Sequence, residues 1–124
     1  MYKRQTPHRR PEVLLGAQTA IKLSKAKLAS DNLQTWVTEH PLDATAWQLM
    51  AAALLSQGRT VAAIRAEAEV NIAQLNYADA LTRLQAAQDA AKNSKSGADY
   101  FEASIVDSRL KQVQQIVKEQ SLER

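Results

Sequence analysis

Apolar residues recur along this chain at the three- and four-residue spacing that marks one face of an α-helix. Pro11 suits the first turn of a helix, and the segment 11–23 that it opens has this spacing. A second such segment runs to His40, where the following Pro41 restricts the backbone and ends it. The pattern therefore predicts a pair of amphipathic helices at the start of the chain.

Capping residues divide the centre of the chain into three further helices. Asp43 is placed to cap the first of them, and Gly58 follows it in a position typical of helix C-termini. Thr60 is expected to cap the next, and Asn76 precedes the one after that. With a last helix expected after the polar residues 93–97, the sequence predicts an all-α fold of about six antiparallel helices.

The spacing of equivalent residues is more specific than the helices themselves. Val13, Trp47 and Leu81 follow one another at about 34 residues, the period of the tetratricopeptide (TPR) repeat. Ile64 stands at the half-period between the last two. A TPR-like right-handed helical solenoid is the predicted architecture, and an irregular helical bundle with the same core is the alternative.

In a TPR repeat, large and small side chains alternate so that two helices pack closely. The chain matches this template near residues 10–43, 44–75 and 61–94, followed by a closing helix at 98–119. The second and third matches overlap, so the repeat frame stays open after Arg59. The residues expected to pack the repeats are Val13, Ala17, Ala29, Pro41, Trp47, Ala51, Leu54, Ala63, Ile64, Ala68, Ala80, Leu84 and Ala87.

Length and composition fit one helical domain over residues 11–119, between a flexible basic leader at 1–10 and a frayed tail at 120–124. The 124 residues are 45% hydrophobic with only three glycines, three prolines and no cysteine, which favours helix and removes disulfides and thiolate zinc sites. The longest apolar runs are far shorter than the roughly 20 residues of a membrane span. No membrane span is expected.

Charge and motifs exclude several classes of function. The net charge is +3, with the excess in the first third of the chain, but no aromatic stacking platform accompanies it, which argues against nucleic-acid binding. The histidines, His8 and His40, form no HExxH motif, and no serine lies in a nucleophile elbow. The sequence thus predicts no catalytic residue, no metal ligand and no cofactor in this chain.

A solenoid of helix pairs offers a concave face that can hold an extended peptide or a partner helix. Projection from the repeat positions places four polar residues on that face, in the first and third helices. The candidate partner-binding residues are Gln18, Lys22, Gln48 and Ser56.

Five short motifs, in this order and spacing, carry a resemblance to a known family. They are PEVLLG at 11–16, DATAWQLMA at 43–51, RAEAE at 65–69, YADAL at 77–81 and DSRLKQ at 107–112. Through them, residues 10–120 resemble the C-terminal TPR region of bacterial periplasmic zinc metallopeptidases of the β-barrel assembly-enhancing protease (BepA-like) family.

The resemblance implies a periplasmic protein-interaction region whose partners are the outer-membrane assembly machinery or unfolded barrel clients. It also implies that zinc and the peptidase residues belong to a domain upstream in a longer parent protein, because none of them has a counterpart here. The alternative is a free-standing cytoplasmic TPR scaffold or regulatory protein that binds a peptide or an acidic partner.

Overall fold

The computed structural model describes residues 9–123, apart from the side chain of Ala98, and within this range it contains helices and no strand. The helices are α1 (Arg10–Lys22), α2 (Ala26–Glu39), α3 (Ala44–Ser56), α4 (Thr60–Ala73), α5 (Tyr77–Lys92) and α6 (Gly97–Leu122). The predicted all-α class and the expected count of about six helices are confirmed.

Both ends of the helical region extend slightly beyond the expected limits. Of the expected leader, residues 1–8 lie outside the described residues, and Arg10 already belongs to α1. At the other end, α6 continues to Leu122, so residues 120–122 of the expected tail are helical.

The predicted cap at Asp43 is confirmed, the one at Thr60 is wrong, and Asn76, expected only to precede α5, also caps its helix. The Asp43 carboxylate accepts a hydrogen bond from the Ala46 backbone N–H at 3.2 Å, and the Asn76 side chain accepts one from that of Asp79 at 3.5 Å. Thr60 is not a cap but the first residue of α4, and Arg59 before it offers no side-chain acceptor. The preceding turn, rather than a cap, fixes where α4 begins.

The three turns that join α1 to α2, α3 to α4 and α4 to α5 have the same backbone structure. In each, the third turn residue donates its N–H to the carbonyl five positions earlier, at 2.7, 3.0 and 2.8 Å. The middle residue is left-handed: φ is +62° at Ser24, +75° at Gly58 and +62° at Leu75. Residues 24 and 58 are 34 positions apart, and residues 58 and 75 are 17 apart.

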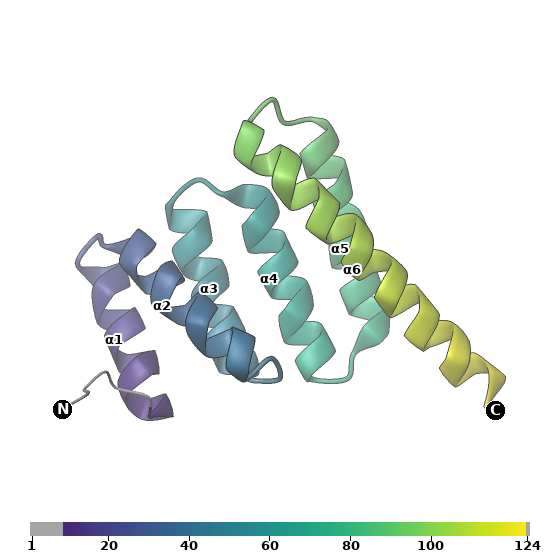
Figure 1. Cartoon of the computed structure of the whole chain (residues 1–124), viewed down its shortest axis with the longest axis horizontal. Helices are drawn as coiled ribbons and strands as arrows, with labels where there is room; N and C mark the ends of the chain where they lie inside the picture. The colour runs from purple at the N-terminus through teal and green to yellow at the C-terminus, as the bar shows by residue number, and fades with distance from the viewer. Residues whose placement is uncertain (1–8, 124) are drawn as a thin grey trace.

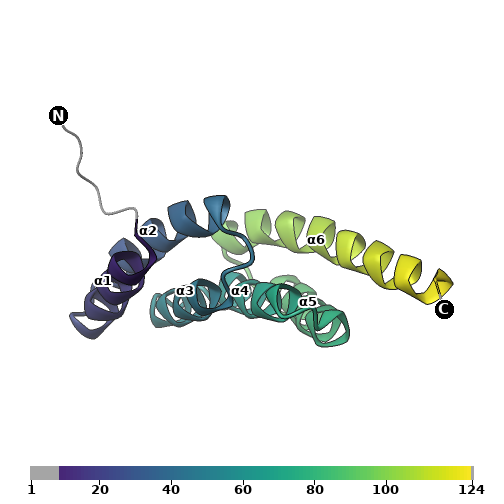
Figure 2. The same cartoon turned by 90° about the horizontal axis from the view of Figure 1, so that it is seen from below.

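The helices form two layers (Figures 1 and 2). Helices α3, α4 and α5 lie side by side in one layer, with α1 at its end. Helices α2 and α6 both lie on the same face of that layer, α2 against α1 and α3, and α6 against α4 and α5. The opposite face of α3, α4 and α5 is covered by no helix of the described residues.

Helix α4 separates two hydrophobic cores. Its Ala62 and Ala66 belong to the core formed by α1, α2 and α3, whereas Val61, Ala68 and Ile72 belong to the core formed with α5 and α6. The small alanine side chains let α4 approach its neighbours closely, because close packing requires side-chain volumes that match the space between helices. A helix buried on two sides in this way fixes the positions of α3 and α5.

Candidate functional site: a groove across α3, α4 and α5

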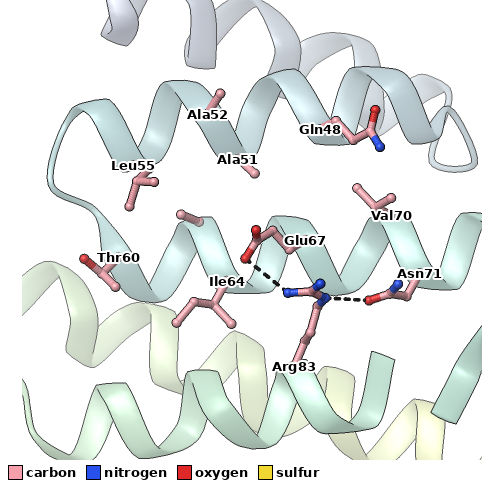
Figure 3. Close-up of a pocket in the computed structure, with 11 residues that line it drawn as sticks. Gln48, Ala51, Ala52, Leu55, Thr60, Ile64, Glu67, Val70, Asn71 and Arg83 are labelled. Carbon is pink, nitrogen blue, oxygen red and sulfur yellow. Dashed lines mark hydrogen bonds and ion pairs between the residues drawn. The ribbon is translucent and has the colours of Figure 1, made fainter. Parts of the chain in front are cut away.

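The uncovered face of the helix layer carries a groove of about 450 Å³ (Figure 3). Its position follows from helix geometry: Glu67 lies about 200° around α4 from Arg65, whose side chain reaches α6. The groove therefore faces away from both α2 and α6. It is lined by Gln48, Ala51, Ala52, Leu55, Thr60, Ala63, Ile64, Glu67, Val70, Asn71 and Arg83.

The floor of the groove is apolar and shallow. Ala51 and Ala52 of α3 and Ala63 of α4 line it, and none of them has a long side chain that would fill the space between the two helices. Leu55 and Ile64 form one end of the groove, and the Leu55 side chain is 62% exposed. Such an exposed leucine beside an alanine floor favours contact with an apolar partner surface.

The opposite part of the groove is polar and is organised by Arg83. The Arg83 Nε donates a hydrogen bond to Asn71 Oδ1 at 2.9 Å, and its Nη1 lies 3.5 Å from Glu67 Oε1 (Figure 3). The Glu67 and Arg83 side chains are each about half exposed. These contacts hold the Arg83 side chain over α4 while its remaining N–H groups stay accessible to a partner.

The structure brings one of the four predicted groove residues to this site. Gln48 lines the groove, and Ser56 is exposed at the last turn of α3 without lining it. Gln18 and Lys22 are exposed on α1, which contributes nothing to the groove. The remaining lining residues come mostly from α4, with Arg83 from α5, and the sequence analysis assigned none of them to the groove.

The thirteen residues expected to pack the repeats lie mainly in the two cores. Val13 and Ile64 are half-buried against these cores, and Pro41 is exposed in the turn between α2 and α3. The Pro41 carbonyl accepts a hydrogen bond from Trp47 Nε1 at 2.8 Å. The buried ones are Ala17, Ala29, Trp47, Ala51, Leu54, Ala63, Ala68, Ala80, Leu84 and Ala87.

Two largely buried ion pairs join α4 to α6, and the sequence analysis did not predict them. Glu69, almost fully buried, accepts hydrogen bonds from Arg109 Nε at 2.7 Å and Nη2 at 2.8 Å, and this contact raises the pKa of Arg109. One helical turn away, the half-buried Arg65 pairs with the buried Glu102. Together the pairs hold α6 on the face opposite the groove.

A second polar cluster fixes the turn between α2 and α3. Arg10 Nε and Trp36 Nε1 donate hydrogen bonds to Asp43 Oδ2 at 2.8 and 2.9 Å. The Arg10 contact, helped by those from Trp36 and Ala46, lowers the pKa of Asp43 to about 2. Asp43 therefore joins α1, α2 and α3 and sets one end of the layer that carries the groove.

The described residues offer no grouping of three histidine or acidic side chains that could hold a metal ion. None of the described helices is long and apolar enough to cross a membrane. Comparison with models of protein families, with curated proteins and with solved structures finds no match in any of the three. The groove itself is therefore the basis for a functional proposal.

Proposed function

We propose that this chain is a non-catalytic protein–protein interaction module that holds a peptide or helix of a partner protein in the groove across α3, α4 and α5. The observation that carries the proposal is the uncovered face of the helix layer. Six of the groove's lining residues are apolar, namely Ala51, Ala52, Leu55, Ala63, Ile64 and Val70. An apolar hollow with a few convergent polar groups at one end is a common form of binding site.

The chemistry of the groove defines the partner segment. Its alanine floor accepts two or three apolar side chains at helical or extended spacing. At the polar end, Arg83 favours a carboxylate or carbonyl oxygen of the partner, while Glu67 favours a basic group or an amide. The partner segment we propose is amphipathic, with apolar residues followed by a polar or charged one.

The architecture we propose is a short TPR-like solenoid. The identical turns at Ser24, Gly58 and Leu75 support it, because they recur at the full and the half period of that repeat. Helix α1 contacts α3, and α4 contacts α6. These contacts support a repeat frame in which α4 is both the second helix of one repeat and the first helix of the next. This is the overlap that the sequence left open after Arg59.

The ordered motifs support a more specific proposal: the chain is the C-terminal TPR part of a periplasmic zinc metallopeptidase or chaperone that acts in outer-membrane protein assembly and quality control. A free-standing cytoplasmic TPR scaffold is the alternative. Sequencing the genomic DNA upstream of the Met1 codon separates them. An open frame encoding a signal peptide and an HExxH helix supports the first, and a stop codon directly upstream supports the second.

Binding in the groove is tested with a phage-displayed library of random 12-residue peptides, selected on the immobilised full chain. We expect enriched peptides that combine apolar and charged residues. Ala52→Arg places a long charged side chain on the exposed α3 lining of the groove and should weaken binding of a selected peptide at least tenfold. Ala78→Arg is the matched control, because Ala78 is also exposed but lies about 140° around α5 from Arg83.

The circular dichroism spectrum of each variant is compared with that of the wild type, so that loss of folding is not read as loss of binding. Absence of enriched peptides would contradict the proposal. So would peptides that bind the Ala52→Arg variant as tightly as the wild type.

A further inference from the structure

The outer face of α1 has an exposed apolar surface, which we call the α1 face. It lies at the end of the helix layer and is distinct from the groove. Leu15 of α1 and Leu23 of the following turn are 64% and 62% exposed there, and Leu28 of the adjoining α2 is 52% exposed. With Glu12, Gly16, Thr19, Ala20 and Lys25 they line a hollow of about 480 Å³.

The equivalent positions of α3 and α5 are buried except the last of each, which is half-buried. The α1 face contains one helical stripe, namely Glu12, Gly16, Thr19 and Leu23. A shift of 34 residues, the spacing of the matching turns at Ser24 and Gly58, moves this stripe onto α3, and a second shift moves it onto α5. The equivalent residues are Ala46, Met50, Ala53 and Gln57 in α3, and Ala80, Leu84, Ala87 and Ala91 in α5.

The α3 stripe shows which kind of element covers these positions. Gln57 Nε2 donates hydrogen bonds to the Ser30 Oγ at 3.0 Å and to the Ala26 carbonyl at 3.4 Å, both in α2. Met50 and Ala53 share its side of α3 and are 1% and 0% exposed. The amphipathic helix α2 thus packs on the α3 stripe, whereas no helix of the described residues packs on the α1 stripe.

The α1 stripe would also let a helix pack closely on it, because its central residues are small. Gly16 is its central residue, and a Cβ placed there would meet no atom within 4 Å. Thr19 is small, and Leu23 is apolar where α3 has the polar Gln57. A docked helix would therefore contact this end through an apolar side chain rather than through hydrogen bonds.

The positive charges beside the α1 face indicate which charge the first turn of the docked helix carries. Arg9 is paired with Glu12 and Lys27 with Asp31, but Lys22 and Lys25 are exposed and form no ion pair within the described residues. The contacts of Gln57 place the N-terminal turn of α2 at the C-terminal end of α3. By the same geometry, the N-terminal turn of a helix on the α1 face lies beside Lys25.

We propose that the α1 face binds an amphipathic helix of a partner protein, with an α2-like apolar stripe and acidic residues in its first turn. The acidic residues interact favourably with Lys22, Lys25 and the dipole of their own helix. A second copy of the same face is a poor occupant, because self-association would bring its lysines together. The docked helix would pack on α1 in the same way that α2 packs on α3.

The probe is a fluorescein-labelled synthetic peptide of residues 24–42, which contain α2, with Lys25→Glu and Lys27→Glu to make its first turn acidic. The unmodified peptide is the matched comparison. We expect saturable binding of the acidic peptide to the full chain by fluorescence anisotropy, at least fivefold tighter than that of the unmodified peptide at low salt. The difference should shrink as salt rises.

Gly16→Arg places a long side chain on the α1 face, where its Cβ meets no atom within 4 Å, and should weaken binding at least tenfold, whereas Ala52→Arg in the groove should leave it unchanged. The second variant keeps this test separate from that of the proposed function. In ¹⁵N spectra the shifted amides should be those of Gly16, Thr19 and Leu23.

Three results of the peptide experiments would overturn the proposal. They are absence of saturable binding up to millimolar peptide, binding unaffected by Gly16→Arg, and shifts at Met50 and Ala53, which would mean that the peptide replaces α2. A dimer in sedimentation equilibrium that Gly16→Arg dissociates would overturn it in favour of a second copy.

Discussion

The same change, Gly→Ala, should have opposite effects at Gly58 and at Gly16. At both positions a new Cβ meets no atom within 4 Å, so packing does not distinguish them. They differ in backbone conformation: Gly58 is left-handed in the turn between α3 and α4, with φ at +75°, whereas Gly16 lies inside α1. The two variants therefore isolate the cost of the repeated turn.

The expected magnitudes follow from the backbone alone. A left-handed alanine lowers the free energy of unfolding by about 1–2 kcal/mol. The lower entropy of the unfolded alanine chain offsets about 0.4–1 kcal/mol of that loss. Gly58→Ala should then lower the free energy of unfolding by about 1 kcal/mol. Gly16→Ala should raise it by about 1 kcal/mol, because alanine is the better residue inside a helix.

Urea denaturation followed by circular dichroism at 222 nm measures both changes. With a slope of about 1–2 kcal/mol per molar urea, the midpoints should move by about 0.5–1 M in opposite directions. Midpoints that move in the same direction, or a neutral Gly58→Ala, would refute the assignment of the turn as a conformational constraint.

Three further predictions concern the elements that position the groove. Glu69→Ala should cost about 2–3 kcal/mol in urea denaturation because it leaves Arg109 partly buried and unpaired, whereas Glu67→Ala in the half-exposed pair should cost less than about 1 kcal/mol; equal costs would contradict this. Because the folded pKa of Asp43 is about 2, below its ordinary 3.8, its stabilising contribution is complete above pH 4 and is lost as pH falls through 2. The stability difference between wild type and Asp43→Asn should shrink by about 1–2 kcal/mol from pH 5 to pH 2, and a constant difference would argue against this linkage. Leu84→Ala should cost about 2–5 kcal/mol in the same assay, since the side chain is fully buried, and a cost below 1 kcal/mol would show that the second core does not depend on it.

The helical spacing of apolar residues and the residues that start and end helices were enough to predict the six helices. Pro41 and Gly58 mark real ends, and Asp43 is the cap that its position suggests. The matching turns at Ser24 and Leu75 could not be predicted, because neither residue is one that ordinarily prefers a left-handed conformation. Both residues are exposed, and each turn is closed around them by a backbone hydrogen bond, from Lys25 N–H to the Ala20 carbonyl and from Asn76 N–H to the Asn71 carbonyl.

The site was harder to predict than the fold because it depends on which helices share a layer. In α6, Ile105 and Val106 lie on adjoining apolar lines, yet only the line of Val106 is buried. The buried partners Glu69 and Arg109 are 40 positions apart, and no local pattern marks them as a pair. Gln48 was found because α3 does carry the groove, whereas the projection onto α1 assumed that every repeat contributes to one continuous face.

The central claim is that the face of α3, α4 and α5 opposite α2 and α6 holds a partner segment. Its most direct test is a titration of the ¹⁵N-labelled full chain with a peptide selected by phage display, followed by amide chemical shifts. The account predicts the largest shifts at Ala52, Leu55, Glu67 and Arg83, with little change in α2 and α6. Shifts confined to α1, α2 or α6 would contradict it.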